Sequence, residues 1–115
     1  MKTIRIRCGD VSWQCLVAET ARERTRGLLQ RDGLPAGELM LIPRCNMIHT
    51  FGMRFPIDVI FLDGHGIVKR IVRNLLPGRM AWGGWAAKQT LEAQSGWLPD
   101  VSIGARIEKS LVASG

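Results

Sequence analysis

Apolar and polar residues alternate along residues 3–17, with Leu16 as the exception, and this is the pattern of strands that bury one face. The pair Gly9-Asp10 interrupts the alternation, and a glycine in the first loop position suits a two-residue type II′ turn. The pattern therefore predicts a β-hairpin in which Cys8 faces Val11. Because a one-residue slip would mix the apolar and polar faces, only this register is expected.

The spacing of apolar residues then becomes helical. Thr20 and Glu23 have the spacing of a capping box, and apolar positions recur as far as Leu29. Gly33 and Pro35 end any continuation of this pattern. We therefore expect one short helix between residues 20 and 29.

From residue 38 onward the apolar runs are short and turns separate them, which is typical of strands. The residues 75–85 between them are expected to be irregular because they are rich in glycine and proline, and residues 109–115 are expected to fray. The predicted strands are residues 39–42, 48–51, 57–62, 67–72, 89–93 and 101–108.

These elements predict a mainly β (α+β) protein: a compact β-sandwich or partly closed barrel of short strands, with one short helix packed on it. The 115 residues fit a single domain over residues 1–115. A hydrophobic fraction of 46% and a charged fraction of 23% are those of a soluble globular protein. Residues 1–7 do not resemble a signal peptide, so we expect a cytoplasmic protein without a membrane partner.

The net charge of +6 comes from basic residues that are scattered along the chain. Without a basic run or an RNA-recognition signature, a solvated basic surface is favoured over nucleic-acid binding. The three cysteines have no CxxC spacing, so neither a disulfide nor a metal site is predicted, and no cofactor motif is present.

Five segments together resemble a known family: residues 21–29, 39–41, 48–53, 55–63 and 91–92. In this order they closely resemble the family called domain of unknown function 192, and the resemblance extends over nearly the whole chain. It implies a small β-rich domain with one helix packed on a curved sandwich or barrel. It implies no reaction, cofactor or catalytic residue.

Asp58 is a lone carboxylate in the apolar run of residues 55–62. A buried carboxylate needs compensation, since an unpaired charge in a dry interior costs several kcal/mol. Asp58 is expected either to accept hydrogen bonds from a loop or an arginine and so to fix the local structure, or to act as an acid or base. The structural role is the commoner of the two.

His49 is the second candidate for chemistry, because it could form an acid–base pair with Asp58. Its apolar neighbours also suit a structural histidine. His65 lies in the predicted turn of residues 63–66, where solvent exposure is expected, and Cys45 is expected to be a small buried hydrophobe.

The sequence Trp82-Gly83-Gly84-Trp85 places two aromatic side chains around two glycines. The tryptophans could border a binding site, with nearby arginines suited to an anion, or they could fill the core. The core role is slightly favoured here.

Three functional hypotheses follow. The first is a non-catalytic binding or interaction domain with a groove for a small anionic molecule or a peptide. The second is a small hydrolase-like enzyme in which Asp58 and His49 are the catalytic pair, and the third is a weak nucleic-acid binder. The residues predicted for the ligand-binding groove are His49, Arg54, Asp58, Arg79, Trp82 and Trp85.

Overall fold

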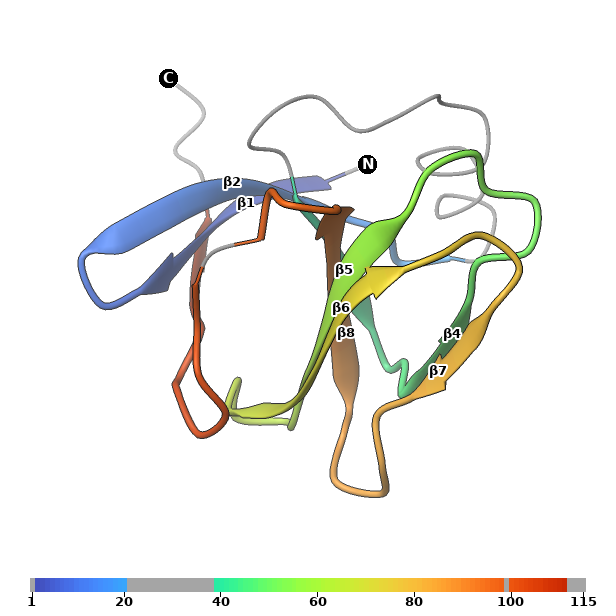
Figure 1. Cartoon of the computed structure of the whole chain (residues 1–115). Coiled ribbons are helices and arrows are strands. Elements are labelled where there is room, and N and C mark those ends of the chain that lie inside the picture. The colour runs from blue at the N-terminus through green and yellow to red at the C-terminus, as the bar shows by residue number, and fades with distance from the viewer. Residues whose placement is uncertain (1, 21–38, 99, 112–115) are drawn as a thin grey trace.

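The computed structural model describes residues 2–20, 39–98 and 100–111. These residues form a seven-stranded sheet with the order β6-β5-β8-β3-β2-β1-β9, and a two-stranded sheet of β4 and β7 (Figure 1). The strands are β1 (Lys2–Cys8), β2 (Val11–Val17), β3 (Leu39–Pro43), β4 (Met47–His49), β5 (Ile57–Leu62), β6 (Val68–Leu75), β7 (Met80–Trp82), β8 (Gln89–Gln94) and β9 (Glu108–Leu111). The protein is therefore mainly β, as predicted.

The first hairpin has the predicted register. Cys8 is paired with Val11, and Ile4 with Cys15 at the other end of the ladder. Gly9 has a φ of 62°, as the first loop position of a type II′ turn requires. All three cysteines of the chain are free thiols, in agreement with the prediction of no disulfide.

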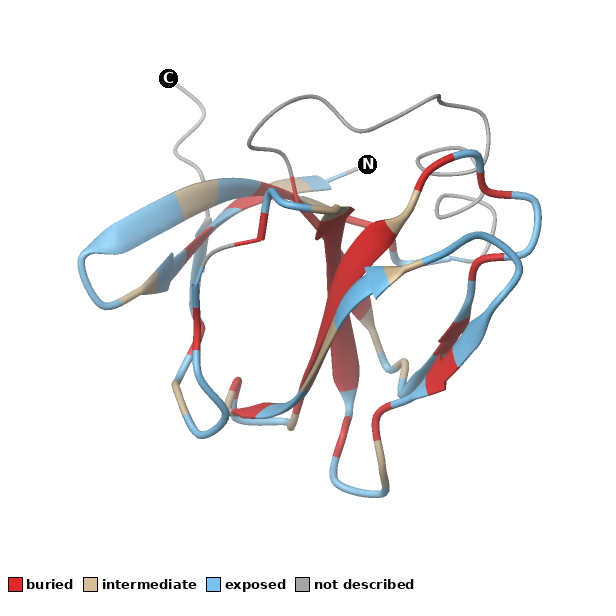
Figure 2. Cartoon of the chain, in the orientation of Figure 1, coloured by how far each residue is buried: buried red, intermediate tan, exposed pale blue. Residues whose placement is uncertain are grey.

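The seven-stranded sheet curls into a half-barrel whose concave face holds the first of two apolar clusters. The central strands β3, β5 and β8 are buried on both faces (Figure 2). This explains the nearly continuous apolar sequences of β3 and β5, whereas β8 also buries Gln89, Thr90 and Glu92. Along β5 the side chains alternate, so that Ile60 and Leu62 belong to the first cluster while Val59 and Phe61 belong to the second.

The second cluster lies on the other face of the sheet, where the β4–β7 ribbon packs. Ile48 and Ala81 form the central pair of this ribbon, and both belong to the second cluster. Thr50, which has no exposed surface, holds the turn between β6 and β7 in place: its Oγ donates to the carbonyl of Leu76 (2.6 Å) and accepts from the backbone N–H of Arg79 (2.8 Å).

The chain just before β9 makes hydrogen bonds to the chain at the start of β6. The N–H of Ile107 donates to the carbonyl of Gly66 (2.8 Å), and the N–H of Val68 donates to the carbonyl of Ala105 (2.9 Å). Gly66 has a φ of 83°, and a β-carbon there would collide with the carbonyl oxygen of Ile107. Only glycine therefore allows these two segments to approach so closely.

Four sequence predictions need correction or concern residues that the structure does not describe. The predicted irregular segment contains β7, because pairing with β4 buries Ala81. The predicted strand of residues 101–108 is wrong, since Gly104 (φ 94°) lies in a tight turn there, and three of the residues expected to fray, Lys109 to Leu111, belong to β9. The predicted helix lies almost wholly outside the described residues, which include no helix.

Candidate functional site

Asp58 is buried at one end of the half-barrel and is surrounded by hydrogen-bond donors. Its carboxylate accepts from the backbone N–H of Asn74 (2.8 Å) and of Gly96 (3.0 Å). The guanidinium of Arg73 (3.3 Å) and the hydroxyl of Ser95 (3.5 Å) complete the group, which we call the Asp58 cluster. The charge is therefore compensated by β6 and by the turn after β8.

The local backbone is shaped around this carboxylate. The pairing of β5 with β6 is irregular between Ile57 and Val59, and Asn74 has a φ of 53°, which residues other than glycine rarely adopt. Asp58 accepts a hydrogen bond from the N–H of Asn74, and this bond offsets part of the strain in the Asn74 backbone. Asp58 thus connects the ends of β5, β6 and β8, as expected for a structural carboxylate, with Arg73 as a partner that the sequence did not indicate.

The structure does not join Asp58 to His49. Asp58 has the same strand alternation as Ile60, on the concave face of the sheet, whereas the ribbon that carries His49 packs on the opposite face. His49 is exposed and stacks on Phe51, with ring centroids 5.3 Å apart. No hydrogen bond joins the two proposed catalytic side chains in the described structure, so direct proton transfer between them has no geometric basis.

The outward side of the ribbon carries large exposed side chains. Met47 is paired with Trp82 and His49 with Met80, and all four are exposed because the neighbouring Ile48 and Ala81 face the core. We call these four side chains the outer ribbon face; Figure 2 shows the exposed positions on either side of the buried ones.

The Trp82–Trp85 loop extends this face. Trp85 is 85% exposed and meets Trp82 edge to face, with ring centroids 5.3 Å apart. The expectation that both tryptophans fill the core is wrong. Gly83 is the residue that packs inward: a β-carbon there would overlap the ring of Phe61, so the glycine lets the loop lie against the core while the tryptophans remain outside.

The segments of the chain that carry the ribbon have charged residues of one sign, although Glu19 lines a neighbouring cavity together with Arg44 and Cys45. Residues 44–57 and 64–91 contain no Asp or Glu, yet they contain seven Arg and Lys residues. Arg70 donates to the backbone carbonyl of Trp82 (2.9 Å), and Arg79 directly precedes Met80. This long interval without acidic residues is visible in the sequence and is a signal that our sequence analysis overlooked.

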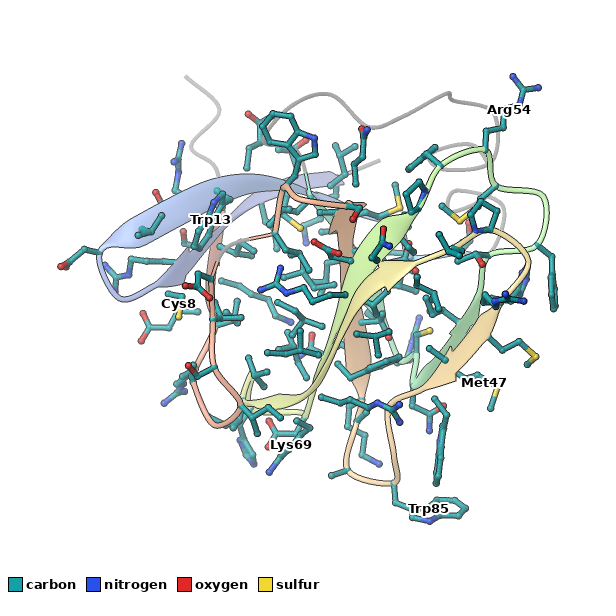
Figure 3. The ribbon with its side chains drawn as sticks, in the orientation of Figure 1. Cys8, Trp13, Met47, Arg54, Lys69 and Trp85 are labelled. Atoms are coloured by element: carbon teal, nitrogen blue, oxygen red, sulfur yellow. The ribbon has the colours of Figure 1, made fainter. Side chains whose placement is uncertain are left out.

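The six residues predicted for one groove are not gathered in one place. Figure 3 shows Arg54 at the upper end of the molecule and Trp85 at the lower end, while Met47 projects outward between them. Asp58 is buried in its own cluster. Only His49, Arg79, Trp82 and Trp85 are associated with the ribbon and the loop that follows it.

One cavity of the described surface lies beside the ribbon. This cavity of about 310 Å³ is lined by residues 44–46, Ala87 and Lys88, and the carbonyl of Asn46 accepts a hydrogen bond from the N–H of Gly83. This cavity therefore adjoins the tryptophan loop. It places two more cations, Arg44 and Lys88, next to the ribbon.

Cys45 and Glu92 add two findings. The thiol of Cys45 donates to the carbonyl of Met47 (3.1 Å), so it supports the start of β4.

Glu92 is fully buried on β8, between Met40 and Val59 of the neighbouring strands. Sequence reasoning did not identify Glu92 as a buried charge, because its strand also contains Gln89, Thr90 and Gln94 and so does not resemble an apolar run.

Among the described residues, no group of three His, Cys, Asp or Glu side chains is arranged to hold a metal ion. The same residues include no helix that is long and apolar enough to cross a membrane.

A half-barrel with an external two-stranded ribbon is the class of fold that these features define. The family model of DUF192, described as an uncharacterised ACR, matches residues 4–109, and the chain belongs to this family. The sequence resemblance to that family is therefore confirmed. No curated protein matches the chain.

Two solved structures share the fold. A candidate transcription regulator from Sinorhizobium meliloti is 21% identical, with a TM-score of 0.78 over 94% of this chain and 92% of that one. A protein of unknown function from Novosphingobium aromaticivorans is 20% identical, with a TM-score of 0.75 over 92% of this chain and 83% of that one. At these identities the likeness shows the fold alone.

Proposed function

We propose that this protein is a binding module, not an enzyme, and that its outer ribbon face holds a segment of a partner polypeptide with apolar and acidic side chains. The observation that carries this proposal is the exposure of the cross-strand pairs Met47–Trp82 and His49–Met80. Gathered exposed apolar side chains mark interaction surfaces, whereas single ones need no explanation.

The residue types at this face suit a polypeptide. Methionine adapts its shape to varied apolar surfaces, and tryptophan is among the residues that contribute most to binding energy. Trp85 is 85% exposed and Met80 is 60% exposed, more than Met47 (48%) and Trp82 (39%). They would provide the apolar anchors of the interface.

The charges around the face favour an acidic partner. Arg70, Arg79 and Lys88 lie beside the ribbon, and the segments that build it contain no carboxylate that would repel an acidic chain. Complementary charge speeds association and selects partners more than it adds affinity. The two methionines favour a polypeptide over a nucleic acid, whose bases stack on aromatic rings.

Fluorescence anisotropy with labelled synthetic peptides tests this proposal. One set of peptides carries leucine, phenylalanine and glutamate, and a matched set replaces each glutamate by glutamine. We expect the acidic set to bind more tightly, and Trp85→Ser to weaken its binding about tenfold or more. Arg79→Gln should weaken binding less and reduce its dependence on salt.

Trp97→Ser is the matched control, because Trp97 is also exposed but lies in the turn after β8. This variant should bind the acidic peptides as the wild type does. Equal affinity of the wild type and Trp85→Ser for every peptide would overturn the proposal. Tighter binding of a single-stranded oligonucleotide than of any acidic peptide would assign the face to nucleic acid instead.

A further inference from the structure

A separate cavity lies where the chain before β9 meets the start of β6. Its volume is about 400 Å³, within the range of sites for small molecules. Residues 64–66 line one side, Gln89 at the start of β8 lies at its base, and residues 106–109 line the other side. The hydrogen bond from Ile107 to Gly66 holds the two sides together.

The cavity carries an excess of positive charge. Arg106 and Lys109 line it together with His65, and Glu108 is the one carboxylate among its lining residues. Glu108 accepts a hydrogen bond from the guanidinium of Arg7 at 2.7 Å, and this contact lowers the pKa of Glu108. The main partner of Glu108 therefore lies outside the cavity, while the positive charge of Arg106 lowers the pKa of Glu108 to a smaller extent.

Lys109 keeps donors that can reach a bound anion, because its side chain is only partly buried. Its ammonium group donates to the side-chain oxygen of Gln89, which is itself buried and donates through its Nε2 to the carbonyl of Asp63 (2.9 Å). An ammonium group has three donors, and in the described structure Lys109 has no carboxylate within ion-pair distance. Partial burial lowers the pKa of Lys109, since the charged form loses hydration.

We propose that this cavity binds a small organic anion through a carboxylate or phosphate group held by Lys109 and Arg106. The oxyanion accepts from the remaining donors of the ammonium and from the guanidinium, while Gln89 fixes the position of the lysine. This site is independent of the outer ribbon face, because the two share no residue.

The test is a titration of the full chain, followed by amide chemical shifts, with three probes: citrate, inorganic phosphate and neutral glycerol. All titrations are made at constant ionic strength. This keeps general effects of salt the same throughout, because both anions also act on proteins by exclusion from the surface. We expect saturable shifts centred on residues 64–66 and 106–109 with at least one of the two anions, and none with glycerol. Citrate and phosphate then distinguish a carboxylate ligand from a phosphate ligand.

Lys109→Gln should raise the Kd of the bound anion about tenfold or more, and Arg106→Gln should raise it less. Arg79→Gln is the control: it removes a positive charge at the ribbon and should leave the Kd unchanged. The melting temperature without anion shows that each variant is folded. An unchanged Kd in both cavity variants, or the absence of saturable shifts with both anions, would overturn this proposal without affecting the ribbon.

Discussion

The Asp58 cluster and the outer ribbon face each contain side chains in surroundings that do not suit them. Asp58 is a charged group with 2% exposure in an apolar core, and Trp85 is an apolar group with 85% exposure to water. The cluster supplies two backbone N–H groups, a guanidinium and a hydroxyl for the carboxylate. The ribbon supplies Trp85 with a single edge contact to Trp82.

This difference separates a structural role from a binding role. A buried charge that the chain itself compensates contributes to the fold and has no donor or acceptor left for a substrate. Exposed aromatic side chains contribute little to the fold, so their placement is better explained by a partner. Each of the following predictions tests one side of this comparison.

Asp58→Ala should lower the free energy of unfolding by about 3 kcal/mol, measured by urea denaturation. The N–H groups of Asn74 and Gly96 would lose their acceptor in partly buried hydrogen bonds, and a donor left without a partner costs up to about 1–3 kcal/mol where it is buried. The ion pair adds less, because the Arg73 side chain is 43% exposed and solvent screens its charge.

Asp58→Asn sharpens this prediction because it keeps one oxygen acceptor. It should lose about half as much stability, while Asp100→Ala, at an exposed position, should change stability by less than about 0.5 kcal/mol. If Asp58→Ala unfolded at the same urea concentrations as the wild type, the cluster would not be structural.

Gly83→Ala should lower the free energy of unfolding by about 1–3 kcal/mol, because its methyl group would overlap the ring of Phe61. Thermal and urea unfolding measure this loss. The variant tests whether the loop that presents the tryptophans is anchored in the core.

A second substitution separates crowding from backbone strain. Phe61→Leu should recover part of the stability lost in Gly83→Ala, because it makes room for the methyl group. It should not rescue Gly84→Ala, whose cost comes from a φ of 93° with open space around it. Equal rescue of both variants would contradict this account.

Trp85→Ser should change the free energy of unfolding by less than about 0.5 kcal/mol, since its ring is almost fully hydrated. The expected effect is on association: the variant should be less prone to self-associate at high concentration, as light scattering would show. A loss of stability as large as that of Asp58→Ala would make this tryptophan structural and remove the contrast between the two regions.

Asp63→Asn should have the smallest effect, confined to acid pH. A hydrogen bond from the N–H of Ile67 is the main cause that lowers the pKa of Asp63 from its ordinary value of 3.8. A carboxylate with a lowered pKa in the folded state stabilises the fold above its ordinary pKa, and this contribution is lost as pH falls through the folded value. Melting temperatures below about pH 4 should therefore decline less steeply in Asp63→Asn than in the wild type.

The parts of the fold that follow from local pattern were predictable. The alternation around Gly9 gives the first hairpin and its register, and the apolar run of residues 57–62 coincides with β5. The short strands β7 and β9 were not predictable, because their partners are far away in the sequence: β7 depends on β4, and β9 depends on β1. Three or four residues carry too little periodicity to show such pairing.

The candidate site was predictable to a similar extent. The need of Asp58 for compensation follows from its apolar neighbours, whereas the identity of Arg73 as a partner depends on the irregular pairing of β5 with β6. The exposure of Trp82 and Trp85 could not be inferred from residue type, since tryptophan is usually well buried. It follows from Gly83, which brings the backbone, and not a side chain, against Phe61.

The position of β9 has a consequence for biosynthesis. β1 hydrogen-bonds to β2 on one edge and to β9 on the other, and the ion pair between Arg7 and Glu108 joins residues 101 positions apart. A nascent chain leaving the ribosome can form the β1–β2 hairpin early, but the other edge of β1 stays bare until β9 has been translated. Premature termination before β9 would leave that edge open to strands of other chains, so truncated products should aggregate.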